Sequence, residues 1–331
     1  MGNNITQPEY NNKALINNEN TNNIAIYISD VWSEFSTCQF NVHKDYLGIK
    51  QQILFNKYIL SLAHIHSDAS IVYNDLTMIS NSELNFTSPK KETCWANDNL
   101  DDVYSLMYIR LNQLKNNSNK LSWSFGGAPG VTDYENLKNI LNNSSTFSEN
   151  SIIYKNFSLL KSAFPQVEYI DIDCEEFFDG WENTVVAFCQ MLYKIGFKIT
   201  LCPYCLTEQW VVNIIVPLYQ NHKVLIDGLN IQFYAYETQF DSDWNKLLLD
   251  NESKIGNKLP EINIGLFLPD KNVHNDYSNT VSDFVSNSKN FNSKFTMGIF
   301  FWNYNKVHND YKYNIKEFND FMYYIKSNIV L

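Results

Sequence analysis

Hydrophobic runs of about six residues alternate with amphipathic stretches along most of the chain. Strands are predicted at 23–28, 58–65, 120–127, 167–175, 198–203, 226–234, 261–267 and 296–302. Helices are predicted at 46–57, 99–114, 131–142, 151–163, 181–195, 208–220, 244–249, 281–288 and 315–329. Eight strands that alternate with helices are typical of a parallel (β/α)8 barrel, an α/β fold also called the TIM barrel.

The same pattern indicates one barrel domain over 23–331, although 331 residues could also form two domains. No linker-like stretch divides the chain. Residues 1–22 are polar and rich in Asn, and they offer too little apolar surface to offset the entropy of ordering, so we predict a flexible arm. A long polar loop is expected from 66 to about 98, where it would build a rim.

The predicted strand over 167–175 carries three carboxylates in line. Asp171, Asp173 and Glu175 share one face because alternate side chains of a strand point the same way, and Ile170 and Ile172 occupy the other face. Like charges at this spacing raise one another's pKa, so we expect one acid to keep its proton near neutral pH while another is ionised. A proton donor beside an acceptor is what glycosidic bond cleavage needs.

The position of these acids in a barrel supports that interpretation, because the active site of a (β/α)8 barrel lies at the carboxyl ends of the strands. Other unusual residues fall at the same end. Gly126 and Gly127 end the third strand, Gln232 and Tyr234 end the sixth, and Trp302 ends the eighth.

Composition and charge exclude several other classes of function. The net charge of −11 argues against binding to nucleic acid or to anionic membrane surfaces, and no apolar run is long enough to span a membrane. The pair Cys202 and Cys205 has the spacing of a half zinc site but lacks a second pair, so we expect these cysteines to pack as small hydrophobes. We therefore predict no metal and no cofactor.

The start of the chain lacks the apolar segment of a signal peptide. We expect secretion without a leader or after its removal, with a cytoplasmic location as the alternative. The protein is expected to be a monomer or part of a larger secreted assembly.

Four segments together resemble glycoside hydrolase family 18. Glu168-x-x-Asp171-x-Asp173-x-Glu175 resembles the D-x-x-D-x-D-x-E signature of its fourth strand, and Ser124-x-Gly126-Gly127 is similar to S-x-G-G on the third. Gln232-Phe233-Tyr234 resembles Q-F-Y on the sixth strand. Phe301-Trp302 resembles the segment of the eighth strand that carries the family's tryptophan. Segments 24–27 and 200–203 resemble the plant class III chitinases and their bacterial relatives. Glu168 and Tyr169 depart from the usual Asp and Gly.

The resemblance implies a retaining hydrolysis in which the substrate assists. Glu175 would protonate the glycosidic oxygen, and the acetamido carbonyl would attack its own anomeric carbon. Asp173 would hold the acetamido group and stabilise the resulting oxazolinium ion, Asp171 would tune Asp173 by sharing a proton, and Tyr234 would bind the acetamido oxygen. The implied substrate-binding residues are Trp302, Gln232, Tyr27, Gly126, Gly127 and Ser124.

Three hypotheses follow. Only about thirty residues separate the last two predicted strands, which leaves no room for an α+β insertion and implies an open groove suited to endo cutting. The first hypothesis is an endo-acting chitinase on β-1,4-linked N-acetylglucosamine polymers, with chitin or a GlcNAc-containing oligosaccharide as its partner. The second is an endo-β-N-acetylglucosaminidase acting on N-glycan cores. The third is a non-catalytic carbohydrate-binding or inhibitor protein.

Overall fold

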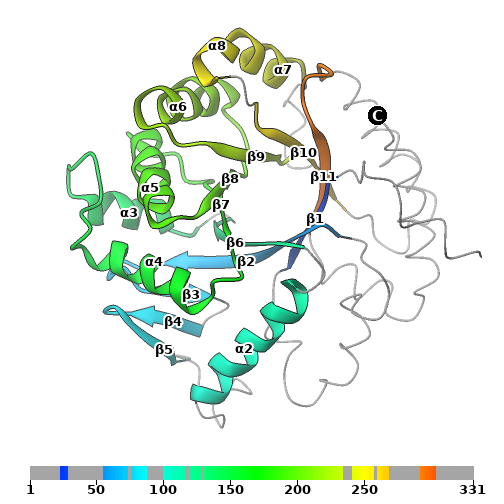
Figure 1. The fold of residues 1–331 in the computed structure, drawn as a ribbon. Helices are drawn as coiled ribbons and strands as arrows, with labels where there is room; N and C mark the ends of the chain where they lie inside the picture. The colour runs from blue at the N-terminus through cyan, green and yellow to red at the C-terminus, as the bar shows by residue number, and fades with distance from the viewer. Residues whose placement is uncertain are drawn as a thin grey trace, which may run out of the picture.

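Eight parallel strands form a closed barrel (Figure 1). The computed structural model describes residues 23–28, 55–73, 76–87, 100–115, 119–127, 130–233, 241–256, 259–267 and 291–302. The barrel strands are β1 (Asn23–Ile28), β2 (Lys57–Ile65), β6 (Lys120–Gly126), β7 (Tyr169–Asp173), β8 (Lys198–Leu201), β9 (Ile226–Ile231), β10 (Glu261–Phe267) and β11 (Met297–Trp302). β1 pairs with both β2 and β11, which closes the barrel and confirms the predicted (β/α)8 fold.

Helices follow the strands and cover the outside of the barrel wall (Figure 1). They are α2 (Leu100–Lys115), α3 (Asp133–Leu141), α4 (Ile152–Ala163), α5 (Trp181–Ile195), α6 (Val216–His222), α7 (Asp241–Asp250) and the short α8 (Glu252–Ile255). A π-helix, η1 (Gln209–Ile215), precedes α6. One α-helix was predicted over 208–220. The first part is instead a π-helix, at whose end the N–H of Val216 bonds the carbonyl of Val211, and Pro217 follows in the first turn of α6, where a missing N–H is tolerated.

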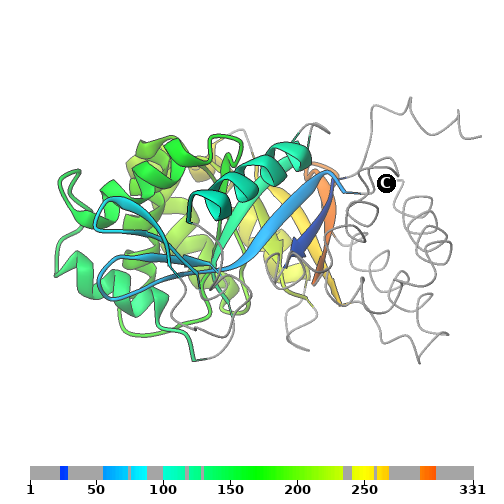
Figure 2. The same ribbon diagram turned by 90° about the horizontal axis from the view of Figure 1, so that it is seen from below.

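The prediction of a long loop from 66 to about 98 is wrong for most of the residues that the structure describes in this range. It contains β3 (Ile71–Tyr73), β4 (Leu76–Ser80) and β5 (Glu83–Thr87), an antiparallel meander that extends from the end of β2. These strands are too short for a clear alternating pattern, yet Ile71, Met78 and Ile79 are fully buried. Figures 1 and 2 show the meander beside α2 and α4.

A second correction concerns the helix predicted over 46–57. Phe55 and Asn56 are not helical, and Lys57 is the first residue of β2. The side chain of Lys57 is buried, whereas a lysine in a polar stretch ordinarily indicates an exposed position. The rest of this helix, the predicted helices at 281–288 and 315–329, and the arm over 1–22 lie outside the described residues.

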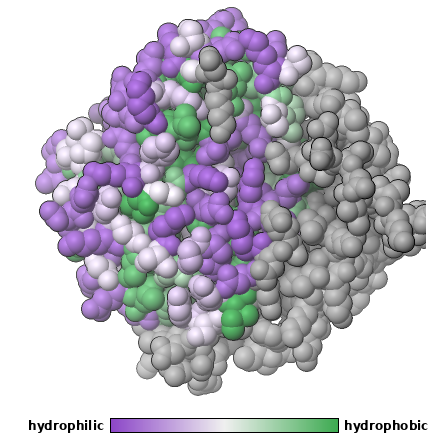
Figure 3. Space-filling model, viewed as in Figure 1, coloured by the Kyte–Doolittle hydropathy of each residue, from purple (hydrophilic) through white to green (hydrophobic). Residues whose placement is uncertain are grey.

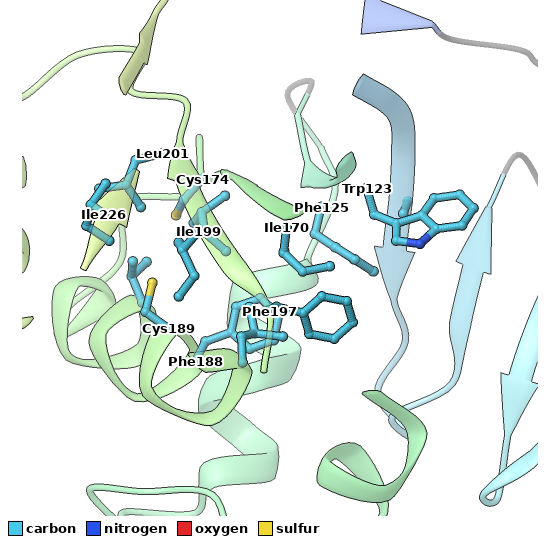
Figure 4. Close-up of a cluster of buried hydrophobic side chains, with 14 of the residues drawn as sticks. Trp123, Phe125, Ile170, Cys174, Phe188, Cys189, Phe197, Ile199, Leu201 and Ile226 are labelled. Atoms are coloured by element: carbon cyan, nitrogen blue, oxygen red, sulfur yellow. The ribbon is translucent and has the colours of Figure 1, made fainter. Parts of the chain in front are cut away.

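The main hydrophobic core lies between the barrel wall and the helices. Figure 4 shows Trp123 and Phe125 of β6 and Ile170 of β7 on the side of the wall that faces Phe188 and Cys189 of α5. The ring centroids of Phe125 and Phe188 are 6.4 Å apart. Because strand side chains alternate, the residues between these apolar ones point into the barrel.

One face of the molecule shows how hydrophobic residues are distributed at the surface (Figure 3). On the described part of the face in Figure 3, they are scattered among hydrophilic ones. Within the described ranges, every helix is too short or too polar to cross a lipid bilayer.

Candidate active site

A buried polar layer inside the barrel is centred on Asp171. Ser124, Asp171 and Thr200 lie next to one another in register across β6, β7 and β8. Oδ2 of Asp171 accepts hydrogen bonds from the hydroxyls of Tyr27 at 2.7 Å and Ser124 at 3.1 Å. Oδ1 accepts from Thr200 Oγ1 at 2.5 Å and from Asn230 Nδ2 at 2.7 Å. Both carboxylate oxygens are therefore fully supplied with donors.

Asp173 and Glu175 lie above this layer, at and just beyond the carboxyl end of β7. The amide of Gln232, one residue past β9, joins them: its Nε2 donates to Asp173 Oδ1 at 2.9 Å and to Glu175 Oε1 at 3.0 Å. Asp173 is 3% exposed and Glu175 is half-buried. The two acids are thus held side by side at the end of the barrel where TIM barrels carry their active sites.

Burial raises the pKa of both acids, and neighbouring charges add to this shift at Asp173. Burial raises the pKa of Asp173 well above its usual value, the charges of Glu175 and Asp171 raise it further, and a hydrogen bond with the Cys202 thiol lowers it. Burial also raises the pKa of Glu175, while the hydrogen bond from Gln232 lowers it. A half-buried acid with a raised pKa is suited to donate a proton near neutral pH.

The two glycines at the end of β6 allow the backbone to pass close to these acids. Gly126 and Gly127 have φ values of 104° and 89°, in the region that favours glycine. A Cβ on Gly126 would lie 2.1 Å from the carbonyl oxygen of Asp173. The N–H of Gly127 donates to that same oxygen at 2.8 Å. A side chain at Gly126 would therefore displace Asp173, and one at Gly127 would meet Leu62 Cδ2 at 2.6 Å and Asp173 Oδ2 at 3.3 Å.

An aromatic group lines the barrel interior next to the acids. The rings of Tyr27 and Trp302 have centroids 5.3 Å apart, and Tyr27 also contacts Phe300 at 5.1 Å. Trp302 is partly exposed, so one part of its ring remains available to a ligand. Tyr234, the other aromatic residue predicted here, lies outside the described residues.

The loop that follows β7 is fastened to the amino end of α3. The carboxylate of Glu176 accepts hydrogen bonds from the backbone N–H groups of Tyr134 at 3.2 Å and Glu135 at 3.1 Å. A carboxylate is stabilised at a helix amino end by the free N–H groups and the helix dipole. Glu175 is thereby fixed between two anchored neighbours, since Cys174 also contacts Glu176.

Four residues of this region are not among the site residues predicted from the sequence. Thr200 and Asn230 bind Asp171, Cys202 lies against Asp173, and Lys57 donates to Thr200 Oγ1 at 3.2 Å. The signal for Thr200 and Asn230 was their position on predicted strands that border one another in a barrel. Lys57 carries no such signal, because the polar pattern over 46–57 predicts a helix and not a barrel strand. Among the described residues, no group of three or more His, Cys, Asp or Glu is arranged to bind a metal.

The two departures from the resemblance lie at the opposite end of the barrel from the acids. Glu168 precedes β7 and forms ion pairs with Lys115 at 2.5 Å and Lys198 at 3.1 Å. The hydrogen bond from Lys115 lowers the pKa of Glu168. Tyr169 begins β7 and is buried under three lysine side chains. Glu168 binds lysines away from the acids, whereas Tyr169 lies against Lys57, which donates to Thr200.

Comparisons with known proteins support the fold. No protein-family model matches the chain, and no match was found among curated proteins. A chitinase from Bacteroides thetaiotaomicron has a similar structure, with a TM-score of 0.53 and 12% identity over 93% of this chain and 96% of that chain. Active domain 2 of a chitinase from Pyrococcus furiosus follows with a TM-score of 0.50 and 12% identity, over 85% and 83%.

A catalytic domain of a group II chitinase from Ostrinia furnacalis has a TM-score of 0.44 and 13% identity. This chain spans 64% of that chain, and 74% of its own length is covered. At such identities the similarities show the fold alone. The protein is a TIM barrel of the kind found in chitinases, with a carboxylate site at the carboxyl ends of its strands.

Proposed function

We propose that this protein is a retaining glycoside hydrolase of the family 18 type that cuts β-1,4-linked N-acetylglucosamine polymers internally. The observation that carries the proposal is the pairing of Asp173 and Glu175 by one amide, that of Gln232, at the mouth of a TIM barrel. The signature segments on β6, β7 and β11 support it, because they lie around this same pair.

Glu175 is the proton donor to the glycosidic oxygen. Its raised pKa supports this role, since a general acid must keep its proton at the working pH. As the leaving group departs, the acetamido oxygen of the substrate bonds to the anomeric carbon and forms an oxazolinium ion. Glu175, now ionised, removes a proton from the water that opens the ion, so the anomeric configuration is retained.

Asp173 holds the acetamido N–H and stabilises the positive charge that develops on the oxazolinium ion. It gains from being fixed beforehand, because a donor or charge already in place needs no reorganisation during the reaction. Asp171 sets the ionisation of Asp173 from below, through charge repulsion. Trp302 offers an apolar floor for the sugar ring, and Tyr234 is assigned to the acetamido oxygen.

The test is release of fluorophore from a chitotriose glycoside by the native protein and by Glu175→Gln. We expect the substitution to lower kcat/KM by at least about a hundredfold, because general acid catalysis is lost. Glu149→Gln is the matched control: Glu149 is exposed and pairs with Lys194 on the outside of the molecule, so activity should be unchanged.

The same assay on an N-glycoprotein separates the two enzyme hypotheses. Cleavage of chitin oligomers without glycan release supports the proposal, and glycan release without chitin cleavage supports the endo-β-N-acetylglucosaminidase. A native protein that cuts neither substrate, yet binds chito-oligosaccharides as well as Glu175→Gln does, would establish the non-catalytic alternative and end both enzyme proposals.

A further inference from the structure

Lys57 is a buried cation directly beneath the polar layer of the barrel. Its side chain is 7% exposed, and no other lysine, arginine or histidine is buried among the residues whose burial the structure describes. A lysine that is removed from water on folding needs a compensating partner, because transfer of an unpaired ammonium ion out of water is strongly unfavourable. The neighbours of Lys57 therefore indicate what the charge serves.

A short chain of hydrogen bonds leads from Lys57 to Asp171. Lys57 Nζ donates to Thr200 Oγ1 at 3.2 Å, and the Thr200 hydroxyl, having accepted, donates its own proton to Asp171 Oδ1 at 2.5 Å. A hydroxyl that accepts from a cation becomes a stronger donor, so the chain transmits positive character to the carboxylate. The other three donors to Asp171, which are Tyr27, Ser124 and Asn230, are uncharged.

The remaining surroundings of Lys57 are mixed in charge. The ring of Tyr169 has its centroid 5.3 Å from Lys57 Nζ, at a distance typical of a cation–π contact. Burial lowers the pKa of Lys57. The charges of Asp171 on β7, Glu261 on β10 and Asp227 on β9 act against this shift and favour the ammonium ion, whereas Lys120 on β6 lowers the pKa further. Lys198 of β8 lies over the same tyrosine ring. Tyr169, the bulky residue in place of a glycine, thus closes the barrel floor under Lys57.

We propose that Lys57 is a positioning residue that acts through Thr200 to keep the negative charge of the Asp171–Asp173 pair on Asp171. In the protein without substrate, the proton of the pair then stays on Asp173, the acid next to Glu175 and the proposed substrate position. For its kinetic consequence this inference rests on the proposed glycosidase function. The charge relation itself holds whether or not the protein is an enzyme, and the two can be tested separately.

The first experiment needs no activity. The melting temperature of native protein is compared with that of Lys57→Met between pH 4 and pH 7, since methionine has similar length and no charge. The attraction between Lys57 and the acids of the site weakens as Asp173 and Glu175, whose pKa values are raised by burial, take up protons. The difference in melting temperature, native minus variant, should therefore be about 2–4 °C smaller at pH 4 than at pH 7.

Lys120→Met is the matched control. Lys120 lies next to Lys57 in register and its Nζ is 5.9 Å from the same tyrosine ring, but its side chain is 44% exposed. Its variant should show no such dependence on the protonation of the site acids. A difference for Lys57→Met that is constant across the pH range, as a packing role alone would give, overturns the inference.

The second experiment uses the pH dependence of kcat/KM on a chitotriose glycoside. Removal of the positive charge makes the acid pair hold its proton more tightly, so the acid limb should move up by about one pH unit in Lys57→Met. Thr200→Val, which breaks the chain but preserves shape, should shift the limb in the same direction. A profile that superimposes on the native one for both variants contradicts the inference.

The inference can still be tested if the variant does not fold or if the protein has no activity. If Lys57→Met does not fold, the melting temperatures and the pH profile are measured on Thr200→Val, and both should change in the same direction as expected for Lys57→Met. If the native protein has no glycosidase activity, the proposed function fails, while the melting temperatures still decide the role of Lys57.

Discussion

At the scale of single residues, the relative placement of Asp173 and Glu175 depends on one neutral side chain. The Nε2 atom of Gln232 is within 3.0 Å of an oxygen on each acid. A neutral donor joins the acids without fixing a charge on either one, so the proton that they compete for remains available for chemistry. An apolar residue of similar size at this position would leave both carboxylates without that contact.

Gln232→Leu should therefore change both rate and pH dependence. The hydrogen bond from Gln232 favours the ionised form of Glu175 and lowers its pKa, so its removal raises that pKa. The alkaline limb of kcat/KM should move to higher pH, and kcat should fall by up to about a hundredfold because the acid is less well positioned. Gln220→Leu, at an exposed position of α6, serves as the control. An alkaline limb that moves to lower pH would show that Gln232 acts in another way.

At the scale of elements, a buried amide of α4 fastens the meander β3–β5, which also pairs with the barrel strand β2. Asn156 is fully buried; its Nδ2 donates to the carbonyl of Ala69 at 2.6 Å and its Oδ1 accepts from the N–H of Ser82 at 2.8 Å. Ala69 and Ser82 both have left-handed φ values, 66° and 65°, at the turns that flank β3 and β4. One side chain thus satisfies two turns at once.

Asn156→Ala should destabilise the protein without touching the acid site. It removes two hydrogen bonds and leaves a buried carbonyl without a partner, which lowers the free energy of unfolding by about 2 kcal/mol or more. The expected fall in melting temperature is about 4–8 °C. Ser158→Ala, on the same helix, removes only a bond from a side chain to its own helix and should shift the melting temperature far less. Equal effects of the two substitutions would contradict an anchoring role for Asn156.

At the scale of the whole molecule, the barrel could be predicted from the sequence because each barrel strand is a compact apolar run. The glycine turn after β6 and the acids of β7 could be placed at its carboxyl end for the same reason. The meander was missed because three to five residues are too few to show a period, and because Asn156, its anchor, is far from it in sequence. Lys57 was missed because a charged side chain ordinarily predicts exposure, whereas its burial depends on Thr200 and Tyr169 of other strands.

The acid site also affects the stability of the whole barrel. The direction of this effect at neutral pH follows from the pKa shift of Asp173. The pKa of Asp173 is raised in the folded state, so the folded protein binds this proton more tightly than the unfolded chain. Stability is then lost as the pH rises from the unfolded value, about 3.9, through the folded value. At neutral pH the buried acid therefore reduces the stability of the native fold, as functional groups often do.

Asp173→Asn should accordingly raise the melting temperature while it lowers activity. The amide neither buries a charge nor has to take up a proton on folding, and it keeps an oxygen that can accept from Gln232, so we expect a gain of about 2–4 °C at pH 7. The gain should shrink as the pH falls toward 4, because Asp173 of the native protein is then protonated in the folded state and ionised in a smaller fraction of the unfolded chains. Asp179→Asn, at an exposed position, should show no gain at either pH. A melting temperature for Asp173→Asn that falls at pH 7 would mean that the fold needs the charge of Asp173, and that Asp171 alone does not carry the negative charge of the pair.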